Sequence, residues 1–113
     1  MPEPTIAQFR RALDALGTPG GSQQKFLTAH HKARGRAATT TQLAKAAQYR
    51  GYTGVNLRYG MLANRIGREL GRRDASLELL CDFVQPEGGR TPDLVLVMKP
   101  RFAAALEQAG WLH

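Results

Sequence analysis

The chain has 113 residues, of which 42% are hydrophobic and 22% are charged, and its formal net charge is +7. This length predicts one domain with a single core, and the composition argues against a disordered chain. The apolar runs are too short to cross a bilayer, the N terminus lacks a signal sequence and the lone cysteine requires no oxidising compartment, so we expect a cytoplasmic protein without membrane contact.

Positive charge is concentrated in the middle of the chain. Residues 25–73 contain eleven Lys and Arg residues and one acidic residue, Glu69, whereas the remainder contains five basic and eight acidic residues. A field segregated in this way attracts polyanions to one face of a protein. A simpler explanation of these basic residues is that they only keep the surface soluble. Solubility, however, does not require a stretch of this length to lack nearly all acidic residues.

The first predicted elements are two helices. Thr5 and Gln8 have the spacing of a capping box and precede an amphipathic pattern. The glycine-rich run 17–21 ends this first helix, and Ser22 is placed to cap the second. We expect the second helix to end in the basic loop 34–36.

A helix-turn-helix pair is predicted next. Threonines 39–41 offer hydroxyl caps for a short helix from Thr41 to about Tyr49, and Thr53 is placed to cap the long helix that follows. In that second helix, five apolar residues recur at helical spacing and form one stripe that we expect to face the core. The stripe consists of Val55, Tyr59, Leu62, Ile66 and Leu70.

The C-terminal third predicts a β-hairpin and a closing helix. Residues 76–85 and 93–99 are rich in Leu, Val and Phe, and turn residues separate them. Pro100 suits the first turn of a helix that ends at Gly110. The fold class predicted for residues 1–113 is therefore α+β and mostly helical, a winged helix-turn-helix with four to five helices and a C-terminal hairpin as the wing.

The second helix of such a pair enters the major groove of DNA, and its outward face carries the residue types that read bases. Arg gives two hydrogen bonds to guanine, Asn does the same for adenine, and Leu57 or Met61 would contact a thymine methyl. Gly60, unusual inside a helix, predicts a close approach by backbone or by another helix. The predicted DNA-binding residues are Lys45, Arg50, Asn56, Arg58, Met61, Asn64, Arg65, Arg68, Arg34, Arg36 and Arg90.

These residues divide by expected role. Lys45, Arg50, Arg34 and Arg36 lie on the first helix of the pair or on loops, where contacts to phosphate are expected. Arg90 lies among glycines at the hairpin tip and is predicted to follow the backbone or a narrow minor groove. For the arginines of the long helix, the alternative to DNA contact is that they only keep an exposed helix face solvated.

Catalytic and metal sites are not predicted. His30 and His31 are adjacent, so on a helix they diverge by about 100° and cannot share a metal ion in the way an i, i+4 pair can. No phosphate-binding glycine loop, paired acid cluster or serine–histidine pattern is present. Cys81 lies in an apolar run and is expected to be a buried structural thiol. We therefore expect no enzyme activity and no cofactor.

Two stretches carry a resemblance to a known family. Residues 39–47 (TTTQLAKAA) and 52–63 (YTGVNLRYGMLA) resemble a helical segment that precedes the catalytic domain in some bacterial HNH endonucleases, including ones suspected of cutting modified DNA. The likeness extends into 97–100 and 105–111, and so covers most of the chain from about Lys25. The 113 residues include no HNH nuclease domain, so the resemblance leads us to expect a DNA-targeting part without the cutting part.

Three functions remain open from the sequence. The first is binding of double-stranded DNA, as a transcriptional regulator or a targeting subunit in a prokaryote or phage, with a homodimer as one form. The second is a phage or mobile-element protein that inhibits a nucleic-acid machine, for example a bacterial defence complex, with Leu57, Met61 and Trp111 as exposed anchors. RNA binding is the third, and the low aromatic content of 7% disfavours it.

Overall fold

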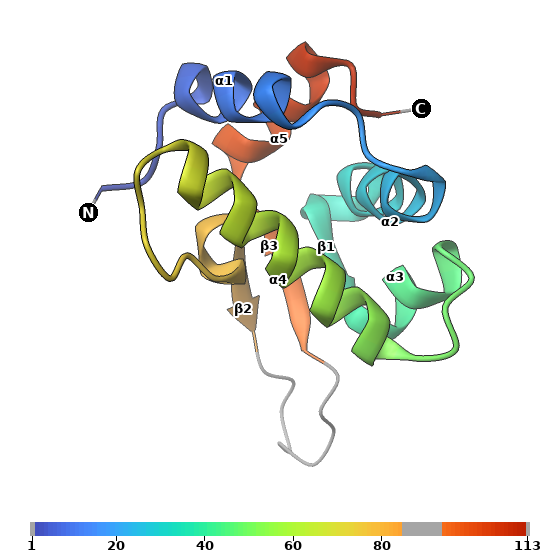
Figure 1. Ribbon diagram of the computed structural model, residues 1–113. Helices are drawn as coiled ribbons and strands as arrows, with labels where there is room; N and C mark the ends of the chain where they lie inside the picture. Colours follow the sequence, from blue (N-terminus) through green and yellow to red (C-terminus); the bar gives the residue numbers. More distant parts are fainter. Residues whose placement is uncertain (1, 85–93, 113) are drawn as a thin grey trace.

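A computed structural model describes residues 2–84 and 94–112 (Figure 1). In these ranges the chain is mostly helical, with five α-helices and a three-stranded antiparallel sheet, which confirms the predicted α+β class. The elements are α1 (Ile6–Leu16), α2 (Gly21–Lys32), β1 (Ala37–Thr39), α3 (Thr40–Ala46), α4 (Tyr52–Glu69), β2 (Cys81–Val84), β3 (Val95–Met98) and α5 (Pro100–Ala109), with 3-10 turns η1 (Arg34–Arg36) and η2 (Leu77–Leu79). None of the described helices combines the length and the apolar character that crossing a membrane requires.

Side-chain caps begin two of the helices. Before α1, Thr5 and Gln8 form the predicted capping box, in which each side chain bonds the backbone N–H of the other residue. Thr39 and Gln42 form the same arrangement before α3, so α3 begins at Thr40 rather than at Thr41. The predicted cap at Ser22 is wrong, because α2 begins at Gly21 and its N-cap residue is the extended Gly20.

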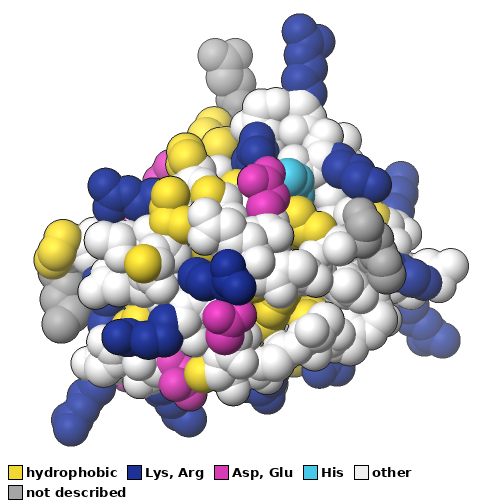
Figure 2. Space-filling model, turned by 90° about the horizontal axis from the view of Figure 1, so that it is seen from above, with side chains coloured by type: hydrophobic (Ala, Val, Ile, Leu, Met, Phe, Trp, Pro, Cys, Tyr) yellow, Lys and Arg dark blue, Asp and Glu magenta, His cyan; other side chains and the backbone are white. Residues whose placement is uncertain are grey.

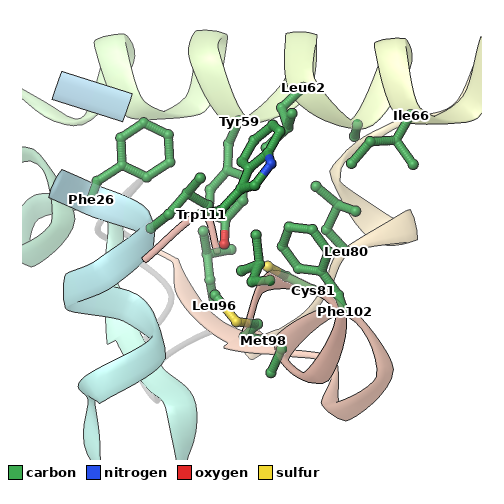
Figure 3. Packing of buried hydrophobic residues seen from close by; sticks show 14 of the residues in the cluster. Phe26, Tyr59, Leu62, Ile66, Leu80, Cys81, Leu96, Met98, Phe102 and Trp111 are labelled. Atoms are coloured by element: carbon green, nitrogen blue, oxygen red, sulfur yellow. The ribbon is translucent and has the colours of Figure 1, made fainter. Parts of the chain in front are cut away.

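The long helix α4 runs across one face of the sheet (Figure 1). It begins at Tyr52 because Gly51 takes the extended backbone of an N-cap residue, so the predicted cap at Thr53 is wrong. The predicted inward stripe is confirmed by its central residues, of which Tyr59 and Ile66 are fully buried. Figure 3 shows that these side chains point at residues of the sheet and of the C-terminal part of the chain, where the core lies.

The sheet has the strand order β1-β3-β2 and antiparallel pairing throughout. The hairpin is therefore confirmed, but its first strand is shorter than predicted, because residues 77–79 form η2. β1 was not expected. It has three residues, too few for a periodic pattern, and its pairing of Ala37 with Val97 is a long-range contact that local spacing does not predict.

α1 and α5 pack side by side at the top of the molecule in Figure 1. Phe9 of α1 and Phe102 of α5 are in ring contact, with centroids 5.6 Å apart. α5 ends at Ala109, and its C-cap residue, Gly110, has a left-handed φ of 71°. Trp111 is buried, so its predicted role as an exposed anchor is wrong, and its carbonyl accepts a hydrogen bond from the side chain of Gln24.

Within α4 the following segment approaches Gly67 most closely, and it does not approach Gly60. A Cβ at Gly60 would meet no described atom within 4 Å, whereas a Cβ at Gly67 would overlap the Cβ of Ala75. The turn after α4 therefore packs directly against the end of the helix. No segment of the described chain approaches Gly60, so the predicted packing of another helix there is wrong, because a helical sequence does not show which of its faces the next segment will cover.

Candidate nucleic-acid interface

The outward face of α4 brings together six of the predicted DNA-binding residues, of which five surround an apolar centre that contains the sixth, Met61. Opposite the buried stripe lie Leu57 and Met61, which are 59% and 40% exposed. Polar and cationic side chains surround them. These are the half-buried Asn56 and Asn64 and the exposed Arg58, Arg65 and Arg68.

A shallow hollow of about 600 Å³ runs along this face of α4. All of the residues just named line it except Arg58, and its far wall is made by Ala75, Ser76 and Leu77. The position of that wall follows from Gly67, because the absent side chain lets Ala75 lie against the helix. The lining of the hollow combines apolar side chains with amide and guanidinium groups, and none of its described lining residues is acidic.

Arg58, at the border of the outward face, lines a second hollow of about 350 Å³. Its other lining residues are Tyr49 and the start of α2, from Gly20 to Gln23. No side chain from the described parts of the chain caps the start of α2. The N-terminal amides of a helix carry partial positive charge, so their field adds to that of the Arg58 guanidinium.

The cations around α4 are not engaged in ion pairs within the described ranges. Lys45 on α3, Arg50 in the turn before α4, and Arg58, Arg65 and Arg68 on α4 form no ion pair with any residue in 2–84 or 94–112. Within α4 itself, the single acidic residue stands at the last position. The charge of these cations therefore remains available to an external anion.

On the face over α1 and α5, in contrast, basic side chains are paired with acidic ones. Seen from above, Asp and Glu side chains lie next to Lys and Arg on that face (Figure 2). The ion pairs there include Arg10 with Asp14 at 3.2 Å and Arg101 with Glu3 at 3.4 Å. Opposite charges offset each other on this side, so the attraction for a polyanion is concentrated around α4.

Two predicted residues, Arg34 and Arg36, lie in η1, which packs against α2 and β3. Arg36 is directed to α5, where its Nη2 lies 3.6 Å from Glu107 Oε1, because η1 leads into β1 and β1 pairs with β3. Arg34 is exposed in the same turn. Arg90 lies outside the described residues.

A buried polar cluster beneath α4 was missed by the sequence reasoning. His30 Nε2 is 2.9 Å from the carbonyl oxygen of Leu96, and its Nδ1 is 2.8 Å from the Tyr59 hydroxyl. Because a carbonyl only accepts, Nε2 carries the proton and Nδ1 accepts from Tyr59. A side-chain hydrogen bond between Tyr59 and Cys81 extends this chain of contacts from α2 through α4 to β2.

Burial keeps the side chains of this cluster neutral. Desolvation lowers the pKa of His30, raises the pKa of Tyr59 well above its usual value and raises the pKa of Cys81 to about 12. Cys81 is therefore a buried thiol, as predicted, and not a thiolate. From the sequence, His30 could be weighed only as a metal ligand, because nothing in the local pattern of α2 indicates a partner on α4.

Metal ligands and known relatives give no further lead to function. The described residues hold no group of three or more His, Cys, Asp or Glu side chains placed to bind a metal ion. A scan of protein-family models and searches of curated proteins and of solved structures found no match to this chain. The resemblance to a segment of HNH endonucleases therefore stays a prediction.

Proposed function

We propose that this chain is a non-catalytic module that binds double-stranded DNA, with α4 as the helix that enters the major groove. The observation that carries the proposal is the outward face of α4, on which Arg58, Arg65 and Arg68 are exposed and form no ion pair with a described residue. Asparagine and arginine on such a face are the side chains that read adenine and guanine edges.

The arrangement of elements supports a winged-helix interpretation. A short capped helix, α3, is followed by a turn, by the longer α4 and then by the β2–β3 hairpin. α4 packs on α3 and buries its apolar stripe, which leaves the opposite face directed outward. This order suits a helix-turn-helix in which the second helix reads bases and the first contacts phosphate.

Phosphate contacts would come from the cations around the helix. Lys45 and Arg50 are exposed on the helix and the turn that precede α4, and Arg58 adds its charge to the start of α2. If about six phosphates are neutralised, the logarithm of the association constant falls with the logarithm of salt concentration at a slope of about −5. We place the protein as a transcriptional regulator or as the targeting subunit of a larger machine.

A fluorescence-anisotropy titration tests the proposal. The full chain is titrated against labelled duplex DNA, single-stranded DNA and RNA at several salt concentrations. We expect the tightest binding to duplex DNA, with the steep salt dependence given above. Flat curves for all three nucleic acids would rule out the proposal, and tighter binding to RNA would replace duplex DNA as the partner.

One observation favours a second candidate, an interaction protein that docks on a nucleic-acid machine. Leu57 and Met61 are exposed, as an anchor at a protein interface must be, although the third expected anchor, Trp111, is buried. Co-purification with a protein partner that survives nuclease and high salt would support this candidate. Loss of the partner under either treatment would favour DNA.

A further inference from the structure

The centre of the proposed DNA-reading face is apolar. Of the five large hydrophobic side chains that are exposed among the described residues, two, Leu57 and Met61, lie one helical turn apart on α4. Gly60 lies beside them and leaves open space where a side chain would stand. The face is therefore a low apolar platform in the middle of a cationic surface.

The charges around this platform favour DNA over a protein as its occupant. Arg65 and Arg68 stand at the edge of the same hollow as Leu57 and Met61, and no described lining residue is acidic. The major groove has the complementary pattern, because phosphates form its two edges and base edges form its floor. The apolar group that projects from this floor in unmodified DNA is the C5 methyl of thymine.

We propose that Leu57 and Met61 recognise C5-methyl groups of pyrimidines in the major groove. Residues four apart on a helix have Cβ atoms about 5–6 Å apart, and successive base pairs are spaced by about 3.4 Å, so the two side chains reach methyl groups within two base-pair steps. Asn64, about one turn further on, suits adenine. In unmodified DNA, all three side chains thus favour a short run of A·T pairs.

This inference rests on the proposed function, because it assigns the base preference of the same face. The C5 methyl has two sources, thymine and 5-methylcytosine, which place it at the same position of the ring. Opposite an unmethylated cytosine or a purine, Leu57 would cover polar groups without bonding them, which lowers affinity. Methyl groups therefore distinguish the preferred duplex from the others.

The experiment compares duplexes that differ only in methyl groups. A duplex is selected with the full chain from a random-sequence pool, and its affinity is measured with thymine and again with deoxyuridine, which lacks the methyl. We expect a loss of about fourfold for each contacted methyl, the value for burying one such group. A second selection from a pool made with 5-methylcytosine tests the other source.

Two variants show whether the platform causes the difference. Leu57→Ala and Met61→Ala should each reduce the ratio between the thymine and deoxyuridine affinities. Ile6→Ala, which trims an exposed apolar side chain on α1, should leave that ratio unchanged. Thermal unfolding of each variant checks that the fold is intact, as expected for exposed positions.

The outcomes separate this inference from the proposed function. Weaker binding to the deoxyuridine duplex, or tighter binding to the 5-methylcytosine duplex than to its unmethylated form, with a smaller effect in Leu57→Ala, supports methyl recognition. Tight duplex binding that ignores both methyl groups overturns the inference and leaves the proposed function standing. Absence of binding to any duplex overturns both.

Discussion

The two faces of α4 share one helix and have opposite composition. The inward face buries Tyr59 and Ile66 completely, and its one polar atom, the Tyr59 hydroxyl, has hydrogen-bond partners. The outward face exposes Leu57 and leaves Arg65 without an ion pair to any described residue. Satisfied groups contribute to stability, whereas exposed and unpaired groups are available to a partner. The inward face should therefore determine folding and the outward face binding.

The strongest test of this division trims one apolar side chain from each face. Ile66→Ala should lower the free energy of unfolding by about 2–5 kcal/mol, because it leaves a cavity in the core. Met61→Ala should change it by no more than about 0.5 kcal/mol, because the side chain is partly exposed. Urea denaturation followed by circular dichroism measures both values. Equal destabilisation by the two variants would contradict the comparison.

A smaller loss is expected from the polar part of the inward face. Tyr59→Phe removes the hydroxyl that bonds His30 and leaves a buried nitrogen without its donor, which should cost about 1–3 kcal/mol of stability. Tyr52→Phe, at the half-buried start of the same helix, serves as the control and should have an effect within about 0.5 kcal/mol. Urea midpoints that coincide for the two variants would argue that the buried hydrogen bond is dispensable.

The outward face is tested by reversing one charge. Arg65→Glu should weaken duplex binding by about tenfold or more, the value of one hydrogen bond between charged groups, without changing stability. Arg11→Glu makes the same change in net charge on an exposed position of α1 and should have a much smaller effect. Anisotropy titrations at one salt concentration compare the two. If both variants lose affinity equally, net charge rather than the α4 face governs binding.

The smallest expected effect is a pH dependence of stability from His30. Burial lowers its pKa below the ordinary value of 6.5, so below that pH the unfolded chain binds more protons than the folded chain. Stability should therefore fall as the pH drops below 6.5, by at most about 1.4 kcal/mol per pH unit, and only until the pH reaches the folded-state pKa.

Urea unfolding at a series of pH values measures this slope. His30→Gln should remove the contribution of the buried histidine, whereas His31→Gln should retain it, because that variant leaves His30 and its partners in place. A wild-type slope that survives in the His30→Gln variant would assign the dependence to other groups.

Sequence periodicity predicted the framework well where the signal was local. The stripe on α4 and the capping box at Thr5 depend on spacings of three or four residues, and the structure confirms both. Side-chain identity was less informative about helix starts, because Gly51 takes the N-cap position that Thr53 was expected to fill. Glycine adopts the extended N-cap backbone without needing a side-chain bond.

The candidate site was predicted in part. The buried stripe of α4 also predicted which residues face outward, because residues on the opposite side of a helix must point away from the core. Tyr59 is buried, and Met61, two residues later, is exposed. The same reasoning could not separate Arg36 from the other cations, because its acidic neighbour, Glu107, comes from α5. In the sequence, Gly60 and Gly67 are both glycines inside the same helix, and nothing local distinguishes them. They differ in the structure because the turn after α4 brings Ala75 against Gly67 only.

The sequence by itself determined the helices, the inward stripe of α4 and the concentration of positive charge in residues 25–73, because these depend on composition and on neighbours within one or two helical turns. Tertiary structure alone decided that β1 joins the sheet, that His30 meets Tyr59 and Leu96, and which cations keep no partner among the described residues. Such contacts join distant segments, and their partners are chosen by the packing of the whole core rather than by local spacing.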